Sequence, residues 1–374
     1  MKKSFTALAI ALLLVSSPKS FAAVKPAGIA RVGDQCLRNG VVAAGRGING
    51  TDLVCMPANL GSAKGDLLWW YPNLKQQNIF ELIAPIVSRS SDAPEVIASR
   101  SADRVGKIVG QGLKGEELIK DYSAKNFTGG YGQLALSTFQ SYRNRTATSF
   151  IGNLNLLSGL TLTKSNINLL DSKPIANLIV EYEAIAVPSN SKYSSITQLV
   201  NDLAADPRAV TFLGGPENGA EYYFFTKFLK SQNIDFRNVS YQSTTSGAQL
   251  LSRLSGDSSK VAISVNGHFV PGVASGKVRI LGLASPDRLP WIKGKTLTSQ
   301  GIPIVFGNWY GVFAPGNIGP SDSDNLLRSL EILHNSKTWI KTLAENYWND
   351  GFQYSSDFNE LIKSQIAEIQ SYQA

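Results

Sequence analysis

Residues 241–315 read YQSTTSGAQLLSRLSGDSSKVAISVNGHFVPGVASGKVRILGLASPDRLPWIKGKTLTSQGIPIVFGNWYGVFAP. A polar turn at the start of this stretch leads into a helix, and two apolar strands follow with a short helix between them. The stretch ends in a further strand, NWYGVFA. Strands that alternate with helices indicate βαβ units, in which helices cover a parallel sheet. The stretch therefore predicts an α/β fold.

The same alternation continues on both sides of this stretch. The run FELIAPIV at residues 80–87 is continuously apolar, as expected of a strand buried on both faces. Ser195 and Gln198 have the spacing of a capping box, which predicts the start of a helix. Residues 322–347 predict two helices, and residues 356–372 predict a last one.

Residues 1–23 have the pattern of a targeting leader. Lys2 and Lys3 precede a short apolar run, and Ala22 and Ala23 end a small-residue cleavage site. The apolar run is too short to span a bilayer. We therefore expect an exported protein, either periplasmic or extracellular and associated with the cell envelope. Loss of the three leader lysines would lower the formal net charge from +8 to +5.

Residues 24–72 differ in pattern from the rest of the chain and contain its only cysteines, Cys36 and Cys55. An oxidising compartment favours a disulfide between them, worth about 3 kcal/mol in the chain-entropy model. The segment resembles the small two-cysteine modules appended to exported bacterial proteins. Two interpretations stay open, a module for adhesion or wall contact and a passive cap on the main domain.

Several enzyme signatures are absent from the sequence. It contains no GxSxG nucleophile elbow, and Leu289 stands where a Walker A loop would need its first glycine. Ser189 and Lys192 match an SxxK motif, but the KTG that accompanies it in penicillin-interacting enzymes does not follow. Two cysteines and two histidines that lie far apart do not predict a metal site. Basic residues are scattered, without the runs typical of nucleic-acid binding. We therefore expect no enzyme and no cofactor, and an exported hydrolase has little support.

Turns rich in Ser, Thr, Asn and Gly follow the predicted strands at residues 88–92, 126–132, 214–219, 243–247 and 264–268. Ligands of open α/β sheets bind at the carboxyl ends of strands, where helix N-termini favour anions. Such turns could hold a carboxylate without an arginine. The alternative is that they are ordinary caps and turns.

A resemblance to a known family favours the first interpretation. The stretches AIAVPSNSKYSSITQLV, FLGGPENGAEY, VSYQSTTSGAQLLSRLSGD, SGKVRILGLASPDRLP and NWYGVFAP resemble the tripartite tricarboxylate transporter receptors, the TctC or Bug family of extracytoplasmic solute-binding proteins. The resemblance covers residues 72–370 and is strongest over residues 183–315. It implies a two-lobed, periplasmic-binding-protein-like (type II) fold with parallel-rich sheets, which closes on a carboxylated ligand by hinge motion. Residues 73–176 and 285–374 would form lobe 1, and residues 177–284 lobe 2, with residues 24–72 as a small disulfide-stapled module.

The resemblance also implies which residues contact the ligand, through backbone amides and small hydroxyls. These are Ser88, Arg89, Ser90, Ser91, Asp92, Gly129, Gly130, Gly132, Asn218, Gly219, Ser243, Thr244, Thr245, Ser246, Gly247, Ser264 and Asn266. The turn at residues 88–92 departs from the family, whose first turn is rich in glycine. Arg89 could pair with a carboxylate through two hydrogen bonds, or point to solvent.

We therefore expect a monomeric receptor that captures a small organic carboxylate and delivers it to membrane transporter subunits or to a sensor. The alternative is a surface or interaction protein that keeps the receptor fold and has lost transport. The added two-cysteine module and the altered first turn favour this alternative.

Overall fold

The structure is a computed structural model that describes residues 27–86, 101–128, 132–143, 145 and 147–372. The predicted leader and part of the predicted helix at residues 93–109 lie outside the described residues. So do seven predicted ligand contacts: Ser88, Arg89, Ser90, Ser91, Asp92, Gly129 and Gly130.

The main body is built on one ten-stranded sheet, in the order β5-β4-β6-β12-β7-β10-β8-β9, with β11 and β13 also paired to β7. Its strands are β4 (Gln77–Ile86), β5 (Ile119–Thr128), β6 (Thr148–Asn153), β7 (Lys173–Pro188), β8 (Thr211–Gly214), β9 (Ser240–Ser243), β10 (Lys260–Val265), β11 (Val278–Leu283), β12 (Gly307–Ala314) and β13 (Asn349–Tyr354). Its helices are α2 (Ser101–Gly115), α3 (Gln133–Ser141), α4 (Leu154–Leu162), α5 (Ile196–Ala205), α6 (Ala220–Ser231), α7 (Gly247–Ser255), α8 (Asn266–Ala274), α9 (Pro320–Asn335), α10 (Lys337–Glu345) and α11 (Ser355–Ser371).

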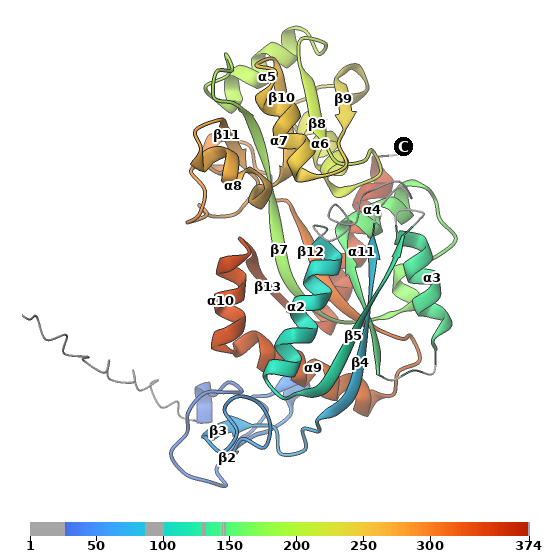
Figure 1. The fold of residues 1–374 in the computed structure, drawn as a ribbon, viewed down its shortest axis with the longest axis vertical. Coiled ribbons are helices and arrows are strands. Elements are labelled where there is room, and N and C mark those ends of the chain that lie inside the picture. The colour runs from blue at the N-terminus through green and yellow to red at the C-terminus, as the bar shows by residue number, and fades with distance from the viewer. Residues whose placement is uncertain (1–26, 87–100, 129–131, 144, 146, 373–374) are drawn as a thin grey trace, which may run out of the picture.

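Strand β7 joins two groups of elements, which Figure 1 shows as a lower and an upper body. Residues 173–182 of β7 pair with β12, whereas residues 183–188 pair with β10 and β11. We name the group around β4, β5, β6, β12 and β13 lobe 1, and the group around β8, β9, β10 and β11 lobe 2. The exchange of partners within β7 falls between Tyr182 and Glu183.

The sheet is mixed in its strand directions. β4 is parallel to β5 and β6, and β8 is parallel to β9 and β10, as the alternating pattern indicates. Every pairing of β7 is antiparallel. Local periodicity does not encode strand direction, because direction depends on which distant strand pairs with which.

The helix predicted to start at Ser195 is present as α5, and the helix, strand, short helix and strand predicted after residue 241 are present as α7, β10, α8 and β11. The predicted cap at Ser195 is also present, because its hydroxyl accepts a hydrogen bond from the Gln198 amide and the Gln198 side chain accepts one from the Ser194 amide. These contacts satisfy amide groups that the first turn of α5 leaves free.

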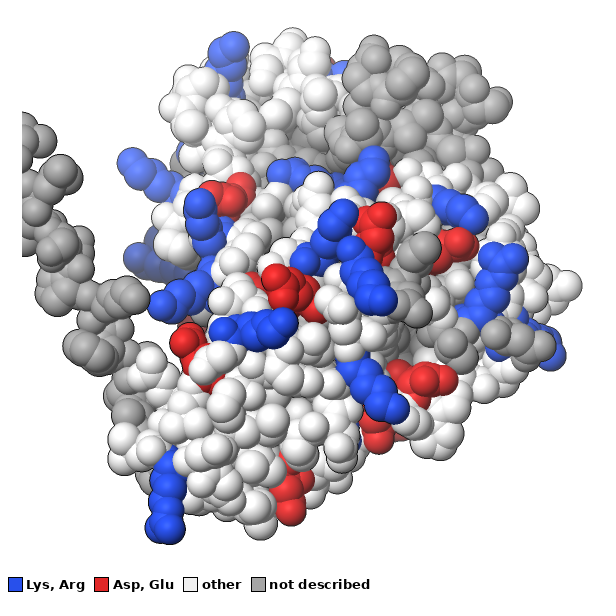
Figure 2. All heavy atoms as spheres, turned by 60° about the horizontal axis from the view of Figure 1, so that its bottom comes forward, with Lys and Arg blue, Asp and Glu red and all other residues white. Residues whose placement is uncertain are grey.

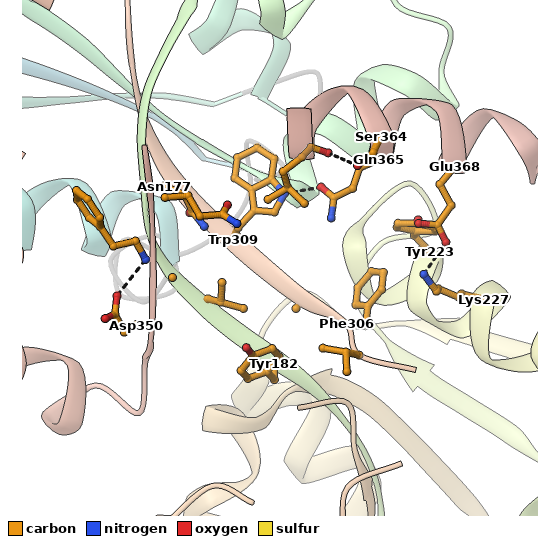
Figure 3. A pocket seen from close by; sticks show the side chains of 17 residues that line it. Asn177, Tyr182, Tyr223, Lys227, Phe306, Trp309, Asp350, Ser364, Gln365 and Glu368 are labelled. Carbon is orange, nitrogen blue, oxygen red and sulfur yellow. Dashed lines mark hydrogen bonds and ion pairs between the residues drawn. The ribbon is translucent and has the colours of Figure 1, made fainter. Parts of the chain in front are cut away.

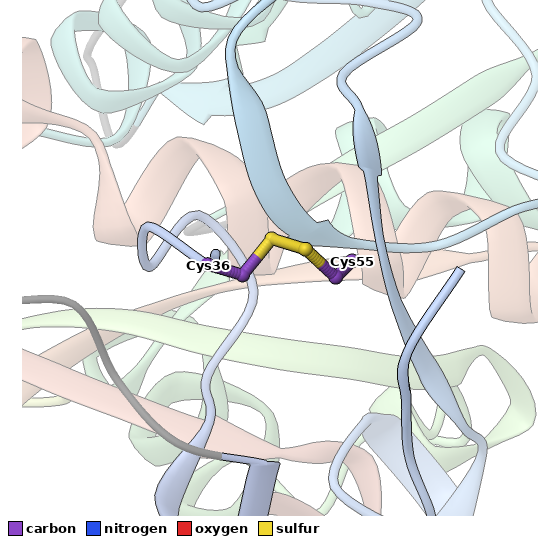
Figure 4. Close-up of a disulfide and its surroundings, with 2 residues drawn as sticks. All are labelled: Cys36 and Cys55. Carbon is purple, nitrogen blue, oxygen red and sulfur yellow. A yellow bond between two sulfur atoms is a disulfide. The ribbon is translucent and has the colours of Figure 1, made fainter. Parts of the chain in front are cut away.

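The N-terminal module forms a three-stranded antiparallel sheet of β1 (Val42–Ala43), β2 (Leu53–Pro57) and β3 (Leu67–Trp70). The predicted disulfide between Cys36 and Cys55 is present, with the two Cα atoms 5.8 Å apart (Figure 4). Trp69 and Trp70 are buried, so both serve the packing of the module.

Tyr71 connects this module to lobe 1. Its buried hydroxyl donates a hydrogen bond of 2.6 Å to Glu331 on α9 and accepts one of 2.8 Å from the Ile48 amide. The other Glu331 oxygen accepts a hydrogen bond from Tyr354. Burial raises the pKa of Glu331, and the two tyrosine hydroxyls oppose that rise by stabilising its charged form.

Charged side chains of both signs are interspersed over the face shown in Figure 2, where they form no extended patch of one sign. This distribution agrees with the scattered basic residues of the sequence.

We predict that Tyr71→Phe lowers the free energy of unfolding by about 1–3 kcal/mol, because it leaves the Ile48 amide and one Glu331 oxygen buried without a partner. Tyr354→Phe is the matched control. Tyr354 is 40% exposed, so water can replace its hydroxyl and the loss should be smaller. Urea unfolding of both variants measures the difference, and equal losses would contradict the proposed role of Tyr71.

Candidate ligand site

The carboxyl ends of β8, β9 and β10 bring several predicted ligand residues together in lobe 2. The Thr244 amide and hydroxyl both donate to the Gly214 carbonyl, at 2.7 and 2.9 Å. The Ser264 hydroxyl lies 2.8 Å from Nδ1 of His268. The His268 ring in turn packs on Gly247, where a Cβ atom on residue 247 would lie 2.7 Å from the ring. The turns at residues 243–247 and 264–268 are therefore neighbours, as their positions at strand ends predict.

The hydroxyl-rich turn before α7 is partly free to meet a ligand. Ser243 and Thr245 are exposed, and Ser246 is half-buried. Ser246 is the N-cap of α7 and accepts from the Gln249 amide, while the Gln249 side chain accepts from the Thr245 amide. Burial lowers the pKa of His268 to about 4, so this histidine brings no positive charge to the turns at neutral pH.

The turn that contains Asn218 and Gly219 meets the opposite lobe. The Ala220 amide, first in α6, donates a hydrogen bond of 2.6 Å to the Asn155 side chain on α4 of lobe 1. A Cβ on Gly219 would lie 2.8 Å from the same Asn155 oxygen, so only glycine allows this approach. The contact holds the N-termini of two helices face to face across the junction between the lobes.

Two other predicted residues are placed by contacts within the protein. Asn266 is fully buried, where its side chain donates to the Tyr182 carbonyl and accepts from the Trp291 indole. Gly132 has a φ of +95°, which favours glycine, and a Cβ there would lie 2.8 Å from Pro85 at the end of β4. Asn266 therefore fixes a loop of lobe 2, and Gly132 packs against the strand that leads to the undescribed turn at residues 88–92.

Three buried glutamates, which no sequence motif predicts, lie at the junction between the lobes. Glu181 and Glu183 lie on one face of β7, since side chains alternate along a strand, and Glu221 lies in the first turn of α6. Their exposed fractions are 7%, 0% and 9%. The only sequence signal was a pair of acidic residues at alternate positions in an otherwise apolar strand.

Burial raises the cost of ionising all three carboxyl groups, and neighbouring glutamate charges raise it further for Glu183 and Glu181. Burial raises the pKa of Glu183 well above its usual range, and the charges of Glu221 and Glu181 raise it further. Burial likewise raises the pKa of Glu181 to about 7. Hydrogen bonds from Tyr310 and Trp348 and the positive charge of Arg104 lower this pKa and so limit the rise. Burial also raises the pKa of Glu221.

Glu221 occupies a position where an anionic ligand was expected. Its carboxyl group lies over the turn at residues 214–219, so that a Cβ on Gly215 would stand 2.6 Å from one of its oxygens. The N-terminus of α6 therefore already has a carboxylate of the protein itself beside it.

A hollow lies on the other side of β7 from these glutamates. It has a volume of about 580 Å³ and is lined by Asn177, Val180 and Tyr182 of β7 together with residues of β12, β13, α6 and α11 (Figure 3). Lys227 of α6 and Glu368 of α11 form an ion pair of 2.5 Å at its edge. None of the predicted ligand residues lines this hollow.

Neither a protein-family model nor a curated protein sequence matches the chain. Solved structures do match it. A TctC solute-binding protein from Polaromonas, solved without ligand, aligns with 16% identity and a TM-score of 0.63 over 81% of this chain and 98% of that chain. The chain has the TctC receptor fold.

Two further solved structures that align with this chain contain small carboxylates. MatC from Rhodopseudomonas palustris, with bound malate, aligns with 14% identity and a TM-score of 0.62 over 81% of this chain and 99% of that chain. A second R. palustris protein, solved with adipate, aligns with 15% identity and a TM-score of 0.64 over 81% of this chain and 97% of that chain. The similarity covers 81% of this chain in each case and confirms the predicted fold.

Two features are absent from the part of the chain that the structure describes. No helix there is both long enough and apolar enough to cross a membrane. No group of three or more His, Cys, Asp or Glu residues among them has an arrangement suited to a metal ion.

We predict that Glu183→Gln stabilises the ligand-free protein at pH 8 and has little effect at pH 4. A carboxyl group whose pKa is higher in the folded than in the unfolded chain stabilises fully below the unfolded pKa, and that stability is lost as the pH rises through the folded pKa. Glutamine cannot ionise and so avoids the loss. Urea unfolding at the two pH values measures the effect, and a gain confined to pH 4 would contradict it.

We predict that Asn155→Ala shifts the ligand-free protein toward an open arrangement of the lobes. The variant removes the hydrogen bond to the Ala220 amide, which is worth about 1 kcal/mol. Asn168→Ala is the control, because Asn168 caps a turn within lobe 1 and makes a similar bond to the Leu170 amide. Small-angle scattering should give a larger radius of gyration for Asn155→Ala alone, and indistinguishable curves would refute the prediction.

Proposed function

We propose that this chain is an exported solute-binding receptor whose two lobes enclose a small organic acid. The observation that carries the proposal is the contact between Asn155 of lobe 1 and the α6 N-terminus of lobe 2, because it brings the strand-end turns of both lobes to one junction. In open α/β sheets such turns are the usual place for ligands. The structures solved with malate and adipate on the same fold support this class of ligand.

The proposed site combines residues from both lobes. Ser243, Thr245 and Ser246 would offer hydroxyls and amides to a ligand carboxylate beside the α7 N-terminus, and Asn155 would close the opposite wall. The turn at residues 88–92 belongs to the same proposal. We also propose that the main body divides into two lobes. One lobe contains residues 73–176 and 285–374, and the other contains residues 177–284.

The proposed role includes export and delivery. The leader pattern at residues 1–23 supports release on the outer side of a membrane, and the receptor would pass its ligand to transporter subunits or to a sensor. Nothing in the sequence or in the described residues suggests chemistry on the ligand. We therefore propose binding without catalysis, by a monomer.

Thermal unfolding of residues 24–374 in the presence of small carboxylates tests this function. The panel should contain mono-, di- and tricarboxylates, each with and without an amino group. A true ligand at 100 times its dissociation constant stabilises the folded chain by about 2.7 kcal/mol, which raises the melting temperature measurably. If no carboxylate of either kind raises it, the proposed function is wrong.

We predict that Gly219→Ala weakens binding of any ligand found in this way. The new methyl group would lie 2.8 Å from the Asn155 oxygen and would hold the lobes apart. Gly115→Ala is the control, because nothing lies within 4 Å of a Cβ at the end of α2. Isothermal titration calorimetry should show weaker affinity for Gly219→Ala and wild-type affinity for Gly115→Ala. Equal affinities would place the ligand away from the junction.

A further inference from the structure

The hollow on the far side of β7 is lined by buried polar atoms that lack a partner. Asn177 of β7 is 1% exposed, and its side-chain oxygen Oδ1 accepts no hydrogen bond from the described residues. The same holds for Oε1 of Gln353 on β13. Both residues line the hollow. An unpaired buried amide costs free energy, so two of them beside one hollow point to a molecule that occupies it.

Two glycines keep side chains out of this space. Gly307 at the start of β12 and Gly351 of β13 both line the hollow next to Val180 of β7. A Cβ would lie 2.4 Å from Val180 at position 307 and 2.7 Å from it at position 351. Both positions therefore need glycine, and neither strand fills the hollow at these points. The sheet itself leaves the room that a ligand requires.

The charged side chains that line the hollow already have partners of opposite charge. Lys227 of α6 pairs with Glu368 of α11 at 2.5 Å, and Asp350 lies 3.0 Å from Nε2 of His334. Among the described residues, no other charged side chain lines the hollow. An ionic ligand would thus meet no unpaired counter-charge there. The two amide oxygens call for a neutral ligand with N–H or O–H donors.

Aromatic rings and a third amide complete the lining. Trp309 is buried and donates a hydrogen bond of 2.6 Å from its indole to Oε1 of Gln365, which leaves the Gln365 amide nitrogen as a donor. Tyr182 is only half-buried, so part of its ring is open to a ligand. In the view of Figure 3, Asn177 and Gln365 lie on one side of the hollow and Tyr182 on the other. A molecule between them would meet amides on one face and an aromatic ring on the other.

A sugar ring matches this combination. Its hydroxyls both donate and accept hydrogen bonds, so they can satisfy the oxygens of Asn177 and Gln353 and the nitrogen of Gln365. The C–H groups of the ring form an apolar face that can pack on the Tyr182 ring. Ligand sites of this kind combine apolar walls with a few placed polar groups, and their volumes of roughly 300–1,000 Å³ include that of this hollow.

We propose that this hollow binds a neutral sugar, either a free monosaccharide or the terminal ring of a glycan. The inference goes beyond the proposed function, because the hollow lies on the other side of β7 and shares no residue with the strand-end turns. The protein then has two ligand sites, one on each side of β7. The second is bordered by both lobes, because α6 belongs to lobe 2 and α11 to lobe 1.

Matched small molecules test the inference. Ligand-observed NMR and calorimetry of residues 24–374 should compare glucose, galactose, mannose and N-acetylglucosamine, each as the monosaccharide and as a short oligosaccharide. Glycerol offers hydroxyls without a ring face, and cyclohexanol offers a ring with one hydroxyl. We expect at least one sugar to bind, and glycerol and cyclohexanol to bind at least tenfold more weakly than that sugar.

The outcomes decide between a sugar site and a less specific hollow. Binding of a monosaccharide supports the inference, and binding of an oligosaccharide alone supports it in the form of a glycan end. Cyclohexanol that binds as tightly as any sugar overturns the inference, because apolar contact alone would then account for the site. Failure of every sugar to bind overturns it as well.

Variants on α11 locate the bound sugar. Ser364 is exposed and lines the hollow, so Ser364→Trp places a large ring in the space and should weaken sugar binding at least tenfold. Ala367→Trp is the matched control, because Ala367 is exposed on the same helix and does not line the hollow. The control should bind the sugar with wild-type affinity. Equal affinities of the two variants would place the sugar elsewhere and overturn the inference.

Removal of one unpaired amide gives a second reading that does not depend on filling the space. Gln353→Ala deletes a hydrogen-bond acceptor of the proposed site and should weaken sugar binding about fivefold, the usual effect of one neutral hydrogen bond. The variant should unfold no more easily than the wild type in the absence of sugar, because the amide oxygen has no partner to lose among the described residues. Unchanged sugar affinity in Gln353→Ala would contradict the proposed role of the amides.

Discussion

The two lobes depend on one strand that both of them share. β7 has 16 residues and at about 3.3 Å per residue spans some 50 Å, far longer than its neighbours. Its two halves exchange partners at Tyr182 and Glu183, so any movement of one lobe against the other bends or twists the backbone there. The contacts on either side of β7 limit that movement, with Asn155 to the Ala220 amide on one side and Lys227 to Glu368 on the other.

The same strand explains why acids are buried at the junction. A residue in the middle of β7 has strands beside it and helix ends of both lobes over its face, so Glu183 has no route to water in this arrangement. Its burial is what raises the pKa of Glu183, and the charges of the neighbouring glutamates raise it further.

Much of the fold followed from local sequence patterns. The helix that starts at Ser195 and the elements after residue 241 were predicted because each depends on a local pattern. Helix caps, apolar faces and glycine turns all involve residues that lie close together in the sequence. β5 and β13 were not predicted individually, because both carry many polar residues and take their place in the sheet from pairing with distant strands. The antiparallel setting of β7 was missed for the same reason.

Only part of the arrangement at the junction between the lobes was predicted. The neighbouring turns at Thr244 and Ser264 followed from the rule that ligands bind at strand ends, and the structure places them side by side. The buried glutamates did not follow, because an acidic residue in a strand normally faces solvent. Their burial arises only when lobe 2 folds back over β7, which no short stretch of sequence encodes.

The attachment of the N-terminal module has a consequence for how the protein could be held in its surroundings. Tyr71 fixes the module to α9 at the end of lobe 1 that lies away from lobe 2, as Figure 1 shows. A surface or a neighbouring molecule that gripped the module would immobilise lobe 1 alone. Lobe 2 could still swing on β7, so the protein could be anchored without obstructing ligand exchange.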